Sequence, residues 1–260
     1  MISRPAILVS AAASLAILAA GGAVPARSET TPAVVVPAPG QAMRLGGDRE
    51  VTAEHRGDEW VSGTASITTP LPVGYPAPTP PGAIDLKTYP SLRRAEVTTE
   101  VGNADIGMTI AFFPLFNHIQ RREIAMTSPV EMDYAGLSVT GQPLPVAAQP
   151  APLKAMTMSF LYRTPELGPV GDDASDAKVT VVDTEPATYL SLGMQGGYSL
   201  ARVRDGMEQL QTWLAANPGW ETVGDVRALH YNGPEKRNRD KWLEVQVKVE
   251  PRPKRSESPR

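Results

Sequence analysis

Apolar residues recur with two different periods between residues 82 and 251, and the order of these periods is the strongest constraint on the fold. Alternation at every second residue is typical of half-buried strands. It occurs in the segments 83–89, 95–101, 123–126, 130–134, 154–163, 177–183, 187–194, 220–232 and 241–250. Two helix-like segments lie among them, so the order strand, strand, helix, strand, strand occurs twice, with one further strand, 154–163, between the two halves. This order predicts an α+β fold of duplicated β-β-α-β-β halves, with a curved, mainly antiparallel sheet and a cleft beside the helices.

Both helices are predicted from spacings of three and four residues. In the first, "AFFPLFNHIQ", the apolar residues are Phe112, Leu115, Phe116 and Ile119, and Pro114 fits only if it lies in the first turn. In the second, Ser199 can cap the N-terminus, and Asn217-Pro218-Gly219 ends the helix. Its apolar stripe consists of Leu200, Val203, Met207, Leu210 and Leu214.

The first 26 residues have the pattern of an export signal. Arg4 supplies a short basic region, residues 6–20 are almost wholly apolar, and Val24-Pro25-Ala26 offers a cleavage site. An apolar run of about 15 residues is too short to span a bilayer, which needs about 20. We therefore expect an exported protein, periplasmic or secreted, with no transmembrane span in the mature chain; a retained N-terminal anchor is the alternative.

Composition divides the rest of the chain. Residues 27–81 are rich in Pro, Gly, Ala, Thr and Ser and show no sustained apolar period, which predicts a flexible or polyproline-like spacer. Residues 82–251 have the usual length of one domain. Residues 252–260 form a short basic tail.

The chain has no cysteine, which excludes disulfides, thiol nucleophiles, thiolate metal sites and covalent haem attachment. Loss of residues 1–26 would remove one charged residue, Arg4, and change the formal net charge from −3 to −4. A net negative charge argues against nucleic acid as a partner.

No residue pattern indicates catalysis. His118 and His230 belong to no H-x-x-x-H spacing, so each is either a polar residue at the margin of the core or an axial ligand for a tetrapyrrole iron. The acids of "GDDASDA" lie in an expected loop and are interpreted as solvated. No nucleophile elbow, Walker or dinucleotide motif occurs. The methionines suit core packing, or a cleft for a large flat apolar ligand.

The segment "LFNHIQRREIAMTSPVEM" resembles the SOUL haem-binding protein family. The matching helix positions are Leu115, Phe116 and Ile119, and the matching positions of the following segment are Ile124, Met126, Thr127, Pro129 and Val130. Further support comes from "LKTYP" near the start of the domain, "MSFLY" in its middle, and "HYNGP" and "WLEVQV" at its end, which occur in the order of the family. The chain departs from the family pattern at His118, where a tyrosine is usual, and at Gln120-Arg121-Arg122.

The resemblance implies a distorted antiparallel β-barrel with two helices, similar to effector-binding domains, and noncovalent binding of haem or another tetrapyrrole in a hydrophobic groove at the first helix. Arginine binds carboxylates bidentately, so we expect Arg121 or Arg122 to anchor haem propionates. The face of the ring would be covered by Phe112, Leu115, Phe116 and Ile119, and His118 is the predicted iron ligand. A solvated helix end is the alternative for the two arginines. A structural or protein-interaction module without a pigment is the alternative function.

Overall fold

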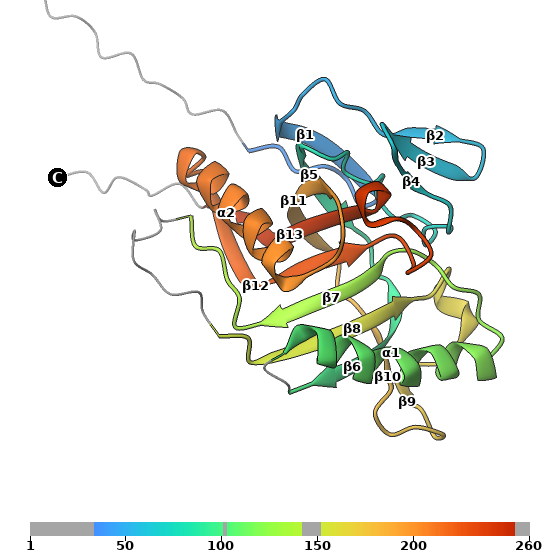
Figure 1. Cartoon of the computed structure of the whole chain (residues 1–260). Helices are drawn as coiled ribbons and strands as arrows, with labels where there is room; N and C mark the ends of the chain where they lie inside the picture. The colour runs from blue at the N-terminus through green and yellow to red at the C-terminus, as the bar shows by residue number, and fades with distance from the viewer. Residues whose placement is uncertain (1–33, 101–102, 142–151, 253–260) are drawn as a thin grey trace, which may run out of the picture. The chain divides into compact units, whose positions relative to one another are not determined.

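The computed structural model describes residues 34–100, 103–141 and 152–252, which belong to one compact unit (Figure 1). The helices are α1 (Ala104–Arg121) and α2 (Leu200–Ala216), with short 3-10 turns η1 (Pro165–Leu167) and η2 (Asn238–Asp240). The strands are β1 (Gln41–Gly47), β2 (Glu54–Arg56), β3 (Glu59–Ser62), β4 (Ala65–Ile67), β5 (Ala83–Tyr89), β6 (Arg93–Thr99), β7 (Val130–Ala135), β8 (Ala155–Leu161), β9 (Gly171–Asp172), β10 (Thr180–Asp183), β11 (Ala187–Gln195), β12 (Trp220–His230) and β13 (Trp242–Pro251). The predicted signal segment and nearly all of the basic tail lie outside the described residues.

Ten strands form one antiparallel sheet in the order β1-β5-β11-β13-β12-β7-β8-β6-β10-β9, and β2-β3-β4 form a second, small sheet. The α+β class with an antiparallel sheet and two helices is confirmed. The prediction of a closed barrel is wrong: within the described residues the outermost strands, β1 and β9, each have one neighbour, so the large sheet is open. Periodicity shows which residues face a core, but it does not show whether the two outer strands meet.

Both helices lie on one face of the large sheet, α1 against β6 and β8 and α2 against β11, β12 and β13 (Figure 1). Because strand side chains alternate between faces, every second residue points toward the helices. The resulting apolar core includes the alternating residues Leu243, Val245, Val247 and Val249, as expected. Helix α2 also matches its prediction, with the Ser199 hydroxyl accepting from the Arg202 N–H.

Helix α1 is longer than predicted and begins at Ala104, where the Asn103 side chain accepts from two backbone N–H groups. Pro114 therefore lies in the helix interior and not in the first turn. Proline removes one helical hydrogen bond there, the one to the carbonyl of Ile110. The predicted strand at 123–126 is also wrong: after α1 the chain turns through Glu123, with φ of 55°, and runs irregularly to β7. The peptide bond between Ser128 and Pro129 is cis.

The opposite face of the sheet is covered by residues that composition had marked as a spacer. β1 pairs with β5 and extends the large sheet, while Ala65 and Ile67 pack against Trp242 on β13. The prediction of a flexible segment over 27–81 is therefore wrong for the described residues from 34 onward, and the folded unit is not limited to 82–251. Prolines limit internal hydrogen bonding, but they do not prevent a segment from packing on a partner elsewhere in the chain.

This second face carries buried charges that are paired and hydrogen-bonded. The Glu244 carboxylate accepts from Lys87 Nζ at 2.8 Å, and both side chains are fully buried. It also accepts from the Thr79 N–H at 2.8 Å and the Tyr231 hydroxyl at 2.7 Å. Burial alone would raise the pKa of Glu244, but Lys87 and the hydrogen bonds lower it. The segment through Thr79 thus completes the hydrogen bonding of a buried acid.

Candidate functional site

A cavity of about 640 Å³ lies between α1, the irregular segment before β7, and the loop that follows β12. Its lining consists of Thr69, Met108, Thr109, Phe112, Phe113, Phe116, Met126, Thr127, Ser128, Val130, Met158, Tyr198, His230, Tyr231, Asn232, Gly233, Pro234, Glu235 and Lys241. The volume is within the range of small-molecule sites, and the mainly apolar lining with a few polar groups is typical of them.

One wall of the cavity is aromatic. Phe112 and Phe116, one helical turn apart on α1, have ring centroids 5.6 Å apart and an interplanar angle of 13°. Phe112 also meets Phe160 of β8 edge to face, at 5.7 Å. Met108, Met126 and Met158 complete this wall with flexible thioether side chains. The wall suits a flat apolar ligand.

His230, the last residue of β12, forms part of the opposite wall. Its ring stacks on Tyr198, with centroids 4.0 Å apart and an interplanar angle of 6°. Burial, together with the charge of Lys241, lowers the pKa of His230 to about 3, so the imidazole is neutral near pH 7. Its Nε2 is buried and has no hydrogen-bond partner among the described residues. His230 is one of the residues that line the cavity, so a bound molecule would meet its neutral ring.

Tyr198 and Lys241 adjoin His230. The Tyr198 hydroxyl accepts from the Asn232 N–H at 2.7 Å and donates to the Trp242 carbonyl at 3.1 Å, which fixes the ring. The Lys241 ammonium lies 5.0 Å from the centre of the Tyr198 ring, within the range of a cation–π interaction. The site therefore joins a neutral base, an aromatic ring and a cation.

The loop at the mouth is held by the N-terminal small sheet. Asn232 accepts from the Trp242 N–H and donates from Nδ2 to the Ser66 carbonyl of β4, each at 2.7 Å. Lys236 also hydrogen-bonds to the Ser66 hydroxyl. A strand from the predicted spacer thus positions one wall of the site.

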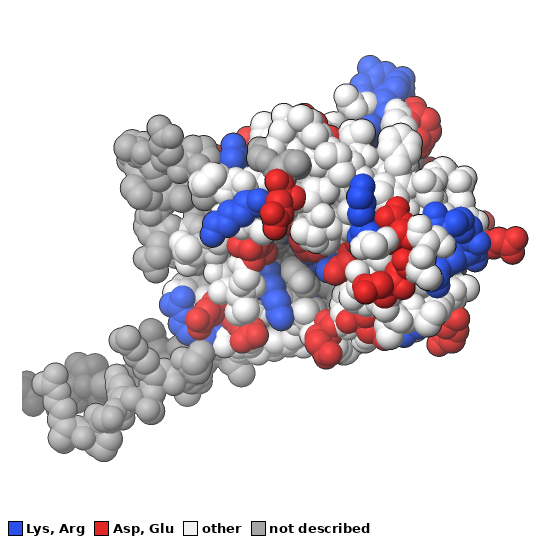
Figure 2. All heavy atoms as spheres, turned by 90° about the horizontal axis from the view of Figure 1, so that it is seen from below, with Lys and Arg blue, Asp and Glu red and all other residues white. Residues whose placement is uncertain are grey.

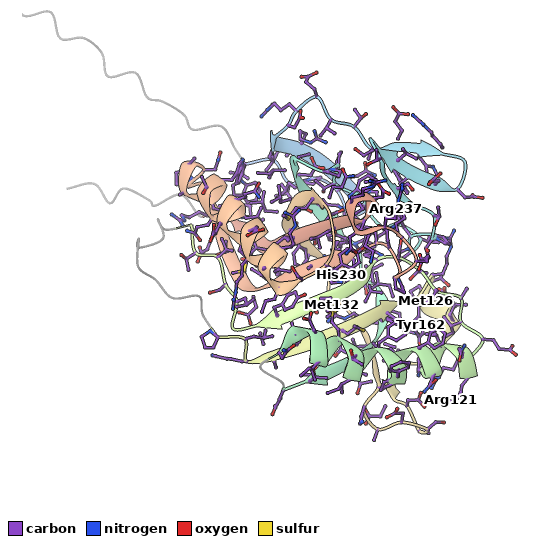
Figure 3. The ribbon with its side chains drawn as sticks, in the orientation of Figure 1. Arg121, Met126, Met132, Tyr162, His230 and Arg237 are labelled. Atoms are coloured by element: carbon purple, nitrogen blue, oxygen red, sulfur yellow. The ribbon has the colours of Figure 1, made fainter. Side chains whose placement is uncertain are left out.

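The residues predicted to form one site lie at different places in the structure. Phe112 and Phe116 line the cavity, whereas Leu115 and Ile119 are buried in the apolar core. Arg121 Nη2 pairs with Asp173 at 2.9 Å, and Arg122 lies beside Gly168; neither lines the cavity. In Figure 3, His230 and Met126 lie above α1 and Arg121 lies below its C-terminal end. The predicted propionate anchors are therefore not at this site.

The structure also contradicts the prediction that His118 is the iron ligand. Its side chain is fully buried, and both ring nitrogens are in use: Nδ1 pairs with the Asp173 carboxylate, and Nε2 bonds to the Tyr162 hydroxyl at 2.7 Å. Burial alone would raise the pKa of Asp173, but hydrogen bonds from His118, the Ser175 N–H and Arg121 hold it well below its usual range. The histidine joins α1 to the loop before β10 and has no nitrogen left for a metal. The prediction that the acids of "GDDASDA" are solvated is therefore wrong for Asp173, which is buried and has a structural role.

Sequence reasoning named His230 as one of two possible iron ligands, but it did not join this residue with Tyr198 and Lys241. Tyr198 lies just before α2, His230 ends β12 and Lys241 lies just before β13, so no local pattern joins them. The available signal was that His230 is a polar residue directly after Ala228 and Leu229, in a segment predicted to be a strand.

Three further observations concern the described residues as a whole. Within the described residues, no group of three or more His, Cys, Asp or Glu is arranged to hold a metal ion. None of the described helices is both long and apolar enough to cross a membrane. On the face shown in Figure 2, Lys and Arg are interspersed with Asp and Glu instead of forming a patch of one sign.

No protein-family model matches the sequence, and the comparison with curated proteins gives no match either. Among solved structures, the EcmrR C-terminal domain matches with a TM-score of 0.50 at 13% identity, over 65% of this chain and 97% of that one. A protein from Listeria innocua described as a hydrolase has a TM-score of 0.46 at 13% identity, over 67% of this chain and 94% of its own. SAV2435 bound to tetraphenylphosphonium has a TM-score of 0.38 at 14% identity, over 64% and 92%. The first of these shows a shared fold.

Proposed function

We propose that the protein is a noncatalytic binder of a flat, apolar small molecule, with haem or a related tetrapyrrole as the ligand. The observation that carries this proposal is a cavity lined by the neutral ring of His230 on one side and by the aromatic wall of Phe112 and Phe116 on the other. Aromatic faces suit a flat macrocycle, and a neutral imidazole suits iron.

The residues present fit such a group. Phe112, Phe116 and the methionines would cover the macrocycle, and His230, in place of His118, would offer a nitrogen to the iron. When bound, haem supplies a redox-active iron and strong visible absorption. The chain's own contribution is to hold His230 neutral by burial and to fix the stacked Tyr198 ring through Asn232.

The proposal includes membership of the SOUL family and export of the chain. The ordered set of segments from "LKTYP" to "WLEVQV" supports the family. We also propose that the two halves are structural repeats. In support, each half contributes a hairpin, β7–β8 or β12–β13, and the two hairpins adjoin through β7 and β12 in the centre of the sheet.

A haemin titration of the purified protein, followed by absorbance, tests the function. We expect a saturable Soret shift with one equivalent of haemin. His230→Ala should change the Soret position and weaken binding at least tenfold, whereas His55→Ala, which removes an exposed histidine from β2, should change neither. No saturable shift would overturn the haem proposal, and an unchanged spectrum in His230→Ala would overturn the role of that residue.

A protein-interaction module is the second candidate, because α1 exposes a row of large apolar side chains. Ile106, Ile110 and Phe113 are 54%, 42% and 59% exposed and lie three or four residues apart. Substitution of Ile106 and Ile110 by Ser should leave haemin binding unchanged. If the wild type captures a protein that this variant does not capture, the second candidate is favoured.

A further inference from the structure

We propose that the mouth of the cavity docks on a lipid bilayer of net negative charge. The exposed apolar side chains of α1, namely Ile106, Ile110 and Phe113, insert among the lipids, and the loop 231–241 between β12 and β13 lies at the headgroups. This inference goes beyond the proposed function, because it concerns a surface outside the cavity and does not depend on which ligand the cavity takes.

Helix α1 lacks the charged outer face that a helix on the surface of a protein usually has. One side of it packs on β6 and β8 (Figure 1), yet residues 106–120 contain no Asp, Glu, Lys or Arg on any side. Ile106, Ile110 and Phe113 follow each other at spacings of four and three residues and therefore share one exposed side of the helix. A helix that is apolar all round is normally covered all round, so this side is suited to contact with an apolar phase.

The exposed area of this row is too small for a stable protein interface. With about 200 Å² for a fully exposed residue of this size, the exposed fractions of 54%, 42% and 59% give roughly 300 Å². A specific protein interface needs about 800 Å² from each partner. A bilayer sets no such minimum, because each apolar side chain that enters it contributes separately to binding.

The apolar row is continuous with the cavity. Phe113 is exposed and also lines the cavity, and on the other side of the mouth Pro234 and Glu235 are exposed lining residues too. These residues form the rim, so a flat surface laid over the mouth meets α1 and the loop 231–241 together. An apolar molecule dissolved in that surface can then enter the cavity without crossing water.

The loop 231–241 supplies positive charge at this rim. It contains four basic residues and two acidic ones. The side chains of Arg237 and Arg239 are 71% and 74% exposed, whereas that of Asp240, which pairs with Arg237, is 10% exposed. An approaching surface therefore meets two guanidinium groups and one carboxylate, that of Glu235, and this net charge is complementary to anionic headgroups.

A fluorophore at one position of α1 tests the docking directly. The chain has no cysteine, so a single introduced cysteine can be labelled with nitrobenzoxadiazole, whose emission rises in an apolar environment. Asn117→Cys places the label on an exposed position one turn after Phe113, and Asp58→Cys places it in the exposed turn between β2 and β3. We expect vesicles of phosphatidylcholine and phosphatidylglycerol to raise the emission at position 117 and to leave that at position 58 unchanged.

Two pairs of substitutions, each made with the label at position 117, test the apolar row. Ile106→Ser with Ile110→Ser removes about as much exposed surface as one whole isoleucine, so the lipid concentration at half-maximal emission should rise at least tenfold. Val35→Ser with Val73→Ser removes a comparable apolar area from residues that are 63% and 62% exposed outside α1, and it should leave that concentration unchanged.

The charge of the lipid tests the loop. Each basic side chain near an anionic surface strengthens binding about fivefold, so vesicles that contain phosphatidylglycerol should bind at least fivefold more tightly than vesicles of phosphatidylcholine alone. Arg237→Gln with Arg239→Gln should remove most of this preference, whereas Lys178→Gln, in an exposed turn, should retain it. Equal binding to both kinds of vesicle by the wild type would overturn the role of the loop.

Failure of this inference and failure of the proposed function give different results. If vesicles leave the emission at position 117 unchanged, or if the isoleucine pair and the valine pair weaken binding equally, α1 does not dock on a bilayer, whatever the haemin titration gives. The row would then be left for a protein partner. Vesicle binding by a protein that gives no saturable haemin shift would instead uphold this inference and overturn the haem proposal.

Discussion

The low pKa of His230 predicts that the protein loses stability as the pH falls, and that one substitution removes this loss. In the folded protein, burial and Lys241 lower the pKa of His230 from the usual 6.5 to about 3. In the unfolded chain the imidazole regains its ordinary pKa. Between these two values the unfolded state therefore binds more protons, and the free energy of unfolding decreases as the pH decreases.

The magnitude follows from the same two pKa values. A pH of 5.0 lies about 1.5 units below the pKa of the imidazole in the unfolded chain, and each unit corresponds to about 1.36 kcal/mol. Protonation of His230 in the unfolded chain therefore lowers the free energy of unfolding by about 2 kcal/mol between pH 7.5 and pH 5.0. The groups facing the ring are Tyr198 and Lys241, and neither offers a negative charge that would stabilise an imidazolium.

Urea unfolding at pH 7.5 and 5.0 measures this loss. His230→Phe keeps an aromatic ring against Tyr198 but cannot take up a proton, so its free energy of unfolding should fall by about 2 kcal/mol less than that of wild type over the same pH change. His55→Phe, on exposed β2, should retain the wild-type pH dependence. Identical pH dependence in wild type and His230→Phe would refute the reasoning, because it would mean that the folded imidazole takes up a proton as readily as the unfolded one.

Three further predictions concern the face opposite the helices. Lys87→Met leaves the Glu244 carboxylate buried without its cation, so urea unfolding should show a loss of about 3–5 kcal/mol, and a loss below about 1 kcal/mol would contradict the buried pair. In Gly193→Ala, the new Cβ would lie 2.2 Å from the Pro80 carbonyl oxygen; we expect a loss of about 1–3 kcal/mol, whereas Gly219→Ala, with its nearest contact at 3.6 Å, should be close to neutral. Deletion of residues 34–81 uncovers Trp242 and Glu244, so the shortened chain should lose its cooperative thermal transition, and a sharp transition at the wild-type temperature would show that these residues are dispensable.

Local periodicity predicted the parts of the fold that depend on one face of one element. The stripe from Val203 to Leu214 and the alternation from Leu243 to Val249 are each complete within a single segment, so their burial could be predicted. The start of α1 was missed because the residues from Ala104 to Ile110 carry few apolar positions toward the core, and their stability comes from the Asn103 cap and tertiary packing.

The N-terminal region and most of the site could not be predicted, because they depend on contacts between distant segments. Thr79 is ordered by a hydrogen bond to Glu244, 165 residues away in sequence. His118 and His230 have similar apolar surroundings in the sequence, yet one has both ring nitrogens engaged and the other lines a cavity. Only the positions of Asp173 and Tyr162 in space distinguish them.

The hydrogen bond from Asn232 to the Ser66 carbonyl connects the cavity with the small N-terminal sheet. We expect a molecule that orders the loop after β12 to stabilise this contact with β4 as well. Amide hydrogen exchange in residues 65–67 should slow when the cavity is filled. Slower exchange there would mean that the N-terminal sheet, whose strands β2–β4 contribute no residue to the described lining, responds to occupancy of the cavity.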